Sequence, residues 1–256
     1  MILHLTFENP QVSIIPLNYQ YYIGSWIYKV LEAGDSEFAK FLHTKGYQGN
    51  DSRKFKLFTF SMLEIPKKTI LKADFQLRIE SPTFSLKVHF LLAEALQPFV
   101  IGLLKNQELV IRSQTYKVQQ VESLPVSITQ ESIQVHTLSP VVISKKRGDG
   151  SEEYLSPEHP EYETLFFHNL MGKYLSTGQT VPAEWEQAPS IFYLLNPDKV
   201  KSKLVTIKAG HASETRVKGY LFDFELHAPA KLMETGLLAG FGKENSWGFA
   251  CGEVMI

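Results

Sequence analysis

Three residues in the N-terminal part of the chain could transfer a proton or stabilise an anion: Tyr28, His43 and Lys56. A phenol or an imidazole can give or accept a proton, and an ammonium group can stabilise negative charge that develops during a reaction. Each residue also has an ordinary structural explanation. Tyr28 could be a surface tyrosine, His43 the end of a helix, and Lys56 a charge on an edge strand. Taken singly, none of them identifies an active site.

Glycines are concentrated near the C-terminus, at positions 236, 240, 242, 248 and 252. Glycine reaches positive φ easily and has no Cβ to hold a ligand away, so such a segment can form a nest of N–H groups for a phosphate. The residues between the glycines include Lys243, Asn245 and Ser246, which suit a nucleic-acid backbone. The alternative is a tight turn before a terminal strand. We expect a solvent-facing loop.

The spacing of G-F-G at 240–242 and G-F at 248–249 resembles the C-terminal glycine-rich signature of the repeat-associated (RAMP) superfamily. Within it, the pattern looks most like the CRISPR-associated endoribonucleases that process precursor CRISPR RNA. Ala250 stands where this signature normally has another glycine. Further segments resemble the same family, so that the resemblance covers essentially the whole chain: residues 18–22, 27–28, 42–43, 56–61 and 137–141.

The resemblance implies that Tyr28, His43 and Lys56 form the active site of a metal-independent endoribonuclease that cleaves precursor CRISPR RNA within its repeats. The 2′-hydroxyl beside each phosphodiester lets RNA be cut without water or metal, leaving a 2′,3′-cyclic phosphate and a 5′-hydroxyl. Histidine can transfer the proton, lysine can stabilise the phosphorane, and tyrosine can orient the nucleophile. The product is expected to stay bound.

Two other lysines could take the place of Lys56. Residues 47–51 lengthen the spacing between His43 and Lys56 relative to the family pattern. Lys45 and Lys54 therefore remain alternatives for the catalytic lysine.

The net charge of −1, from 26 basic and 27 acidic residues, hides two basic stretches. Residues 43–78 hold eight Lys/Arg against three Asp/Glu, and residues 199–218 hold six against one. Such stretches can be solvated faces, or they can line one groove for a phosphate backbone. We expect RNA contacts from the glycine-rich loop and from basic residues of the second half: Gly240, Gly242, Lys243, Asn245, Ser246, Gly248, Lys145, Lys146, Arg147, Lys199, Lys201 and Lys203.

Hydrophobic periodicity predicts the elements that position these residues. An amphipathic helix over about residues 20–33 carries Tyr28 off its apolar stripe, and a second short helix ends near His43. A strand rich in aromatic residues begins at Lys56. The stretch 176–200, with three prolines, is expected to be loop and short elements, and residues 14–18 a connection. In the second half we expect strands near 131–145, 203–208 and 216–227, helices near 160–175 and 230–238, and a final strand.

The order strand, helix, strands, helix, strand occurs in each half of the chain. It predicts an α+β fold of two tandem ferredoxin-like (RRM-like, βαββαβ) domains. Residues 1–124 would carry the catalytic residues, and residues 125–256 the glycine-rich RNA-binding loop. The two halves share the order of elements but no visible residue identity.

The composition of the chain bears on its cellular compartment and on whether it binds a metal or a cofactor. With 44% hydrophobic and 21% charged residues the chain can form a packed core, and no apolar run reaches membrane-spanning length. Cys251 is the single cysteine, and the N-terminus lacks signal-peptide features, which favours a cytoplasmic protein without disulfides. The other histidines are scattered, so we expect no metal and no cofactor.

The expected partners are CRISPR repeat RNA and, further, a multi-subunit CRISPR effector complex, with the chain a monomer or homodimer and no membrane involved. A second hypothesis is a subunit of such a complex that binds repeat RNA without cleaving it. A third, ferredoxin-like domains for small ligands or proteins, is disfavoured by the glycine-rich segment and the two basic stretches.

Overall fold

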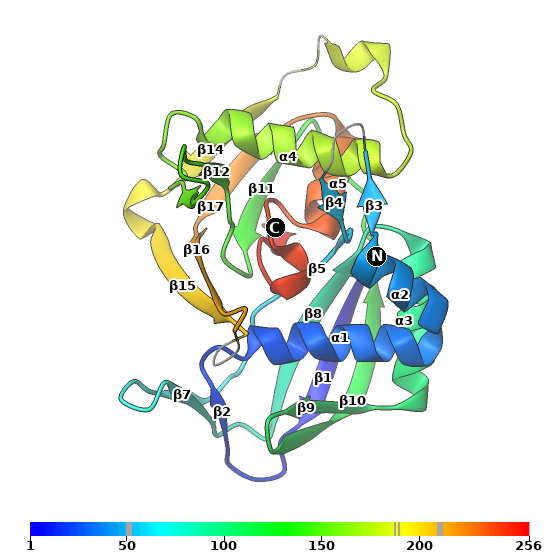
Figure 1. Cartoon of the computed structure of the whole chain (residues 1–256), viewed down its shortest axis with the longest axis vertical. Coiled ribbons are helices and arrows are strands. Elements are labelled where there is room, and N and C mark those ends of the chain that lie inside the picture. Colours follow the sequence, from blue (N-terminus) through cyan, green and yellow to red (C-terminus); the bar gives the residue numbers. More distant parts are fainter. Residues whose placement is uncertain (50–52, 187, 189, 209–211, 256) are drawn as a thin grey trace.

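Five helices of regular length and two main antiparallel sheets are described in the computed structural model (Figure 1). It describes the whole chain apart from residues 50–52, 187, 189, 209–211 and 256, so part of the segment 47–51 lies outside the described residues. The first half contains β1 (Ile2–Glu8), β2 (Ser13–Pro16), α1 (Gln20–Gly34), α2 (Ser36–Thr44), β3 (Tyr47–Gln48), β4 (Lys54–Phe55), β5 (Phe58–Phe60), β6 (Lys68–Leu71), β7 (Gln76–Ile79), β8 (Thr83–Phe90), α3 (Ala93–Lys105), β9 (Glu108–Ile111) and β10 (Gln114–Leu124). The second half contains β11 (Ser132–Thr137), β12 (Ser144–Lys146), β13 (Glu152–Tyr154), α4 (Tyr162–Ser176), β14 (Ile191–Leu195), β15 (Lys201–Ile207), β16 (Thr215–Leu221), β17 (Asp223–His227), α5 (Ala230–Ala239) and β18 (Gly252–Val254), with short 3₁₀ turns at Ala183–Glu186, Pro197–Lys199 and Asn245–Trp247.

The two main sheets have the same strand arrangement. The first has the order β5-β8-β1-β10-β9, and the second has the order β14-β17-β11-β18. With strands numbered within each βαββαβ unit, both follow the order 2-3-1-4, to which β9 adds an edge strand in the first sheet. The expected α+β fold of two tandem ferredoxin-like units is confirmed.

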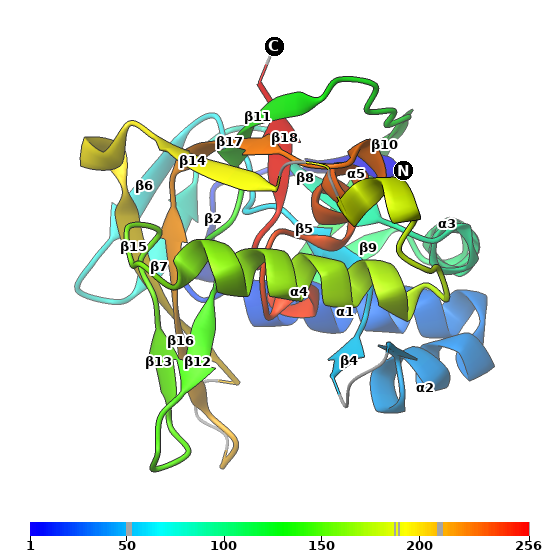
Figure 2. The ribbon, with the colours of Figure 1, turned by 90° about the horizontal axis from the view of Figure 1, so that it is seen from above.

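Each unit has its own hydrophobic core. One buried cluster draws its residues from between Leu3 and Val118, and another from between Ile133 and Ala250. In the view of Figure 2, α1 and α4 lie on one side of the molecule and β8, β17 and β18 on the other. The helices therefore cover one face of each sheet, and that side carries the candidate site.

Among the described residues, five short strands lie outside the strands predicted from the sequence: β2, β3, β4, β13 and β14. The stretch 176–200 contains short elements, as expected, and one of them, β14, is the edge strand of the second sheet. Residues 14–18 were read as a connection, but β2 pairs with β7 in a small sheet with β6. Prolines lie at the ends of β2 and of β14, and they argue against a strand in the sequence. Pairing with β7 stabilises β2, and pairing with β17 stabilises β14.

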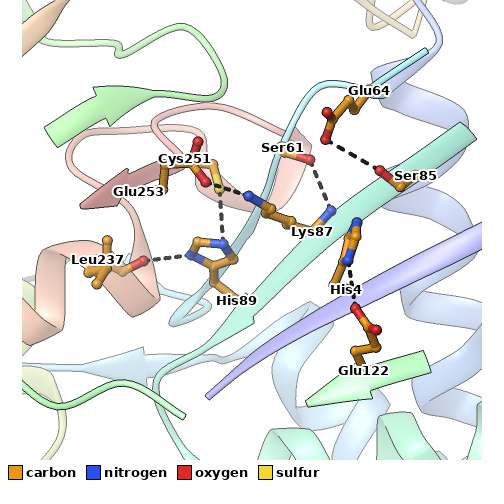
Figure 3. A network of polar contacts seen from close by, with 10 residues as sticks. All are labelled: His4, Ser61, Glu64, Ser85, Lys87, His89, Glu122, Leu237, Cys251 and Glu253. Atoms are coloured by element: carbon orange, nitrogen blue, oxygen red, sulfur yellow. Dashed lines mark hydrogen bonds and ion pairs between the residues drawn. The ribbon is translucent and has the colours of Figure 1, made fainter. Parts of the chain in front are cut away.

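A buried histidine links the two units (Figure 3). The Nδ1 of His89 in β8 lies 2.8 Å from the carbonyl oxygen of Leu237 in α5, and its Nε2 lies 3.5 Å from the Sγ of Cys251. This geometry fits a neutral ring that donates from Nδ1 and accepts from the thiol. Burial lowers the pKa of His89 to about 4, and burial raises the pKa of Cys251. Beside this pair, Lys87 forms an ion pair with Glu253 across the same junction.

We therefore expect acid to weaken the fold through His89. Unfolded histidine titrates near pH 6.5, so between about pH 6.5 and 4 the unfolded chain binds a proton that folded His89 does not. The contribution of neutral His89 to the free energy of unfolding is complete above about pH 6.5. It is lost as the pH falls toward 4, which lowers the free energy of unfolding by about 3 kcal/mol. Urea unfolding of the wild type and of His89→Gln, measured between about pH 6.5 and 4, checks this pH dependence of stability. Parallel pH profiles for the two proteins would contradict the assignment.

Candidate active site

Tyr28 and His43 meet on the helical side of the first unit. Asp35 ends the turn between the helices, and its side chain accepts a hydrogen bond of 2.9 Å from the N–H of Phe38, which caps α2. The cap turns α2 back toward α1, so the rings of Tyr28 and His43 pack edge to face with centroids 5.5 Å apart. His43 is exposed in the last turn of α2, where the helix dipole suits a cationic side chain.

The Tyr28 and His43 side chains line a pocket of about 450 Å³. Its polar lining also includes Glu32, Glu37 and Lys40. A phenol and an imidazole at one solvent-accessible pocket can share a proton-transfer step with a bound ligand.

The hydroxyl of Tyr28 contacts the glycine-rich segment. The side chain of Ser246 shares a hydrogen bond with it, and burial raises the pKa of Tyr28 to about 12 despite that bond. Tyr28 therefore stays un-ionised at neutral pH and can donate a hydrogen bond. Because Ser246 belongs to the second unit, this hydrogen bond forms only when the two units pack together.

Of the three candidate lysines, Lys56 lies against His43. Its Nζ donates to the carbonyl oxygens of Leu42 and, at 3.0 Å, of His43. Burial, and then the charge of Lys54, lower the pKa of Lys56. Lys54 reaches the carbonyl oxygen of Thr44 at 3.4 Å, and Lys45 is exposed at the end of α2.

A second pocket opens behind Lys56. It has a volume of about 380 Å³ and lies between β4, α4 and the glycine-rich segment. Five of the residues that line it are basic: Arg53, Lys54, Lys56, Lys173 and Lys243. Of the three residues predicted to be catalytic, Tyr28 and His43 therefore line one pocket, and Lys56, which bonds to the backbone of His43, lines the other.

The glycines of the segment 240–252 face protein atoms, so the expectation of a solvent-facing loop is wrong at these positions. Gly240, Gly242 and Gly248 are all buried. A Cβ on Gly242 would lie 2.6 Å from the carbonyl oxygen of Val142, and one on Gly248 would lie 2.4 Å from the ring of Phe60. The missing side chains therefore allow the segment to pack between the two units.

Backbone hydrogen bonds hold the same segment in place. The N–H groups of Lys243 and Ala250 donate to the carbonyl oxygens of Val142 and Pro140 at 2.8 and 2.9 Å. Ala250 adopts φ of 61°, in the left-handed region that favours glycine, so the alanine preserves the backbone course of the signature. These N–H groups are directed into the protein and cannot form an anion nest.

The side chains between the glycines are also engaged. Lys243 Nζ donates to Ser144 Oγ at 2.8 Å and lies 3.4 Å from a Glu152 carboxylate oxygen. Asn245 Nδ2 donates to the carbonyl oxygen of Phe249 at 3.1 Å. Ser246 bonds to a candidate catalytic residue, Tyr28, and Lys243 and Asn245 line the same pocket as Lys56.

Lys173 is a residue that the sequence reasoning missed. It is 1% exposed, and its Nζ donates to the carbonyl oxygens of Gly240 and, at 2.7 Å, of Gly242. Burial lowers the pKa of Lys173 well below its usual range. The pattern did contain a signal, because Lys173 follows Phe166 and Leu170 at i+7 and i+3 on the apolar stripe of α4.

The basic run at 145–147 lies on the β12–β13 hairpin, where carboxylates already pair with two of its members. Lys145 forms an ion pair with Glu161, and Arg147 lies 3.7 Å from Glu153. Lys146 is exposed.

The second run lies on the Pro197–Lys199 turn and β15. Lys199 and Lys201 are exposed, whereas Lys203 is partly buried with its Nζ 3.0 Å from Met62 Sδ. The hairpins that carry the two runs touch, since Tyr154 donates to the carbonyl oxygen of Arg216 at 3.2 Å. This contact lies at the end of the β15–β16 hairpin away from Lys201, and neither run lines the Tyr28–His43 pocket.

Neither a metal cluster nor a membrane helix is found in the part of the chain that the structure describes. No group of three His, Cys, Asp or Glu residues there could hold a metal ion. None of the described helices is long and apolar enough to cross a membrane.

Two ferredoxin-like units with a glycine-rich segment packed between them define a protein of the RAMP class. Family models match nearly the whole chain: "CRISPR-associated protein Cas6, N-terminal" matches residues 14–122 and "CRISPR associated protein Cas6, C-terminal" matches residues 119–254. The chain therefore belongs to the Cas6 family of CRISPR-associated proteins.

Relatives and solved structures agree with this assignment. The CRISPR-associated endoribonuclease Cas6 1 of Methanocaldococcus jannaschii is 27% identical, over 97% of this chain and 91% of its own length. A structure described as "Characterization of a Cas6-related gene from Pyrococcus furiosus" is similar with a TM-score of 0.82 at 21% identity, covering 100% of this chain and 98% of that chain. One described as "An RAMP protein binding different RNA substrates" has a TM-score of 0.80 at 19% identity, covering 100% of each chain. At these identities the structural likenesses show the fold alone.

Proposed function

We propose that this protein is a metal-independent endoribonuclease that cleaves precursor CRISPR RNA within its repeats and keeps the product bound. The observation that carries the proposal is the convergence of Tyr28, His43 and Lys56 at the junction with the glycine-rich segment. The name of the M. jannaschii relative, an endoribonuclease matched along nearly its full length, supports the same reaction class.

In the proposed reaction the 2′-oxygen attacks the adjacent phosphorus and the bond to the 5′-oxygen breaks. The proton lost by the 2′-hydroxyl is balanced by the proton gained by the leaving oxygen, giving a 2′,3′-cyclic phosphate and a 5′-hydroxyl. His43 transfers a proton, and the neutral hydroxyl of Tyr28 orients the reacting group by donating a hydrogen bond. An ammonium group has three donors, so Lys56, with two of them on the carbonyls of Leu42 and His43, has one left for a phosphate oxygen.

Cleavage of repeat RNA in excess EDTA tests the proposal. The repeat is taken from the CRISPR array beside the gene, and the cut site is mapped first. A second RNA then carries a single 2′-deoxynucleotide immediately 5′ of the scissile phosphate. We expect full cleavage of the first RNA with EDTA, a cyclic phosphate on its product, and no cleavage of the second. Cleavage of the deoxy RNA, or loss of activity that Mg²⁺ restores, would contradict the mechanism.

The alternative is a subunit that binds repeat RNA without cutting it. Two features favour this RNA-binding subunit over a protein that binds small ligands or other proteins. They are the cationic pocket behind Lys56 and the exposed lysines of the second unit. Tight binding without cleavage at any divalent-ion concentration would establish this alternative. Size-exclusion chromatography of the same samples distinguishes a monomer from a homodimer. Co-purification of the protein with a multi-subunit effector complex tests whether the product is delivered to that complex. Residence in the cytoplasm also belongs to the proposal.

We expect RNA affinity to depend on salt, with unequal contributions from the two basic runs. The slope of log affinity against log salt falls by about one for each phosphate contact removed. Changing Lys199, Lys201 and Lys203 together to Gln should lower it by about two, because two of these side chains are exposed. Changing Lys145, Lys146 and Arg147 to Gln should lower it by about one, since Glu161 and Glu153 already pair with two of them.

Filter binding between low and moderate salt measures these slopes. Lys117→Gln, which removes an exposed charge on β10, is the control and should leave the slope unchanged. Slopes equal to the wild type in both triple variants would show that the runs are solvated faces.

A further inference from the structure

A groove separates the β6–β7 hairpin of the first unit from the β15–β16 hairpin of the second. Figures 1 and 2 both place these hairpins beside one another, at the end of the molecule where α1 begins. The volume of the groove is about 680 Å³, larger than that of either pocket at the candidate active site. We call it the hairpin groove. Its lining residues that matter below are Lys68, Ile70, Phe75, Lys203, Leu204 and Arg216.

Large apolar side chains lie open to solvent in the hairpin groove. Phe75 is 72% exposed, Leu204 59% and Ile70 53%. Exposed apolar groups gathered on one concave surface mark a binding site more often than single exposed residues do. Phe75 lies in the turn between β6 and β7, and its exposed fraction leaves most of the ring accessible to a partner.

The backbone of Phe75 is held in an unfavourable conformation. Its φ is 51°, in the left-handed region that bulky side chains disfavour, and its carbonyl oxygen accepts a hydrogen bond of 2.8 Å from the N–H of Leu17. A glycine would relieve the strain, and the exposed ring contributes little to the core. An exposed aromatic side chain held in a strained backbone conformation points to a role outside folding.

The charges of the hairpin groove have one sign. Lys68, Lys203 and Arg216 line it, and no acidic residue appears among its described lining residues. Glu214 stands nearby, 3.9 Å from Arg216. Burial, and then the charge of Lys68, lower the pKa of Lys203, which shows how closely the cations of the two hairpins approach. An anionic partner would be drawn to this groove.

The hairpin groove and the candidate active site lie along the same helix. Tyr19 lines the groove and precedes the first residue of α1, and Tyr28 lies nine residues further on. At 1.5 Å per residue this separates them by about 14 Å along the axis. A few extended nucleotides span this axial distance, and because nine residues are about two and a half helical turns, an RNA that occupies both must also pass around the helix.

We propose that the hairpin groove is a binding subsite for unpaired nucleotides of the RNA, where one base stacks on Phe75 while Lys68 and Arg216 contact the phosphates on either side. Aromatic rings beside a cationic track are the general means of holding single-stranded nucleic acid, because every base has a flat face. The subsite rests on the proposed function, since it binds the same RNA that His43 would cleave. An acidic protein segment is the competing occupant.

Affinity for repeat RNA made uncleavable by the 2′-deoxy substitution tests the subsite. Phe75→Ala should weaken binding about 10-fold, and Phe75→Trp should restore it, since stacking on one base typically contributes that much or more. Leu104→Ala is the matched control, because Leu104 on α3 is also 72% exposed and lies outside the groove. At saturating RNA the single-turnover cleavage rate of Leu104→Ala should equal that of the wild type.

Two further measurements separate stacking from charge. Phe75→Ala should leave the salt slope unchanged, whereas Lys68→Gln and Arg216→Gln should each lower it by about one. RNA with 5-iodouridine at successive positions should crosslink to Phe75 from one or two unpaired positions only. Wild-type affinity for repeat RNA in both Phe75→Ala and Arg216→Gln would overturn the subsite and favour the protein segment, while normal cleavage in the same proteins would leave the proposed function intact.

Discussion

His43→Ala should lower the single-turnover cleavage rate of repeat RNA by about 10²–10⁴, the usual contribution of a general acid or base. Its affinity for RNA should stay within a few-fold, because phosphate contacts dominate binding and the imidazole adds none of the cationic lining around Lys56. Ring contact with Tyr28 in a solvent-accessible pocket is the geometric reason for choosing this histidine.

His168→Ala is the matched control, because His168 is an exposed histidine on α4 that lines neither pocket. It should cleave at the wild-type rate. A normal rate in His43→Ala would remove His43 from the mechanism, whatever the other variants do.

Variants of the neighbouring residues should have milder effects. Tyr28→Phe removes the hydroxyl that bonds to Ser246 but keeps the ring packing on Phe58. Lys56→Ala removes both a cation and the donor to the end of α2, so its melting temperature must be measured beside its rate. Lys54→Ala then tests the alternative lysine. A larger rate loss in Lys54→Ala than in Lys56→Ala would transfer the role to Lys54.

Gly242→Val should destabilise the protein strongly. A Cβ there would lie 2.6 Å from the backbone oxygen of Val142, and valine adds two further methyl groups. Overpacking against a fixed backbone costs about 1–3 kcal/mol or more, so a fall in melting temperature of about 5–10 °C is expected. Cleavage by the folded fraction should also fall, because the same segment carries Ser246 to Tyr28.

Gly148→Val is the control for this experiment, since a Cβ at Gly148 meets nothing within 4 Å. Thermal unfolding and RNA affinity are measured on the same samples. A Gly242→Val protein that melts normally yet loses RNA affinity would restore the original expectation, in which the glycines face the ligand.

The sequence by itself determined the family, the α+β fold class and the identity of the candidate catalytic trio. Periodicity placed α1 and α2 within about one residue of their observed ends, because both helices are amphipathic and one ends at Gly34. The family pattern selected Tyr28, His43 and Lys56 from many other polar residues. Their catalytic roles stay predictions until the variants are measured.

Tertiary structure alone decided what each side chain contacts. Whether a glycine faces solvent or a distant carbonyl depends on packing between segments about one hundred residues apart, as Gly242 and Val142 show, and local pattern carries no such information. The position of Lys173 on the apolar stripe of α4 indicated burial, but its two carbonyl partners in the glycine-rich segment could be known only from the tertiary structure. The hairpin groove, too, exists only because residues near 70 and near 204 fold against one another.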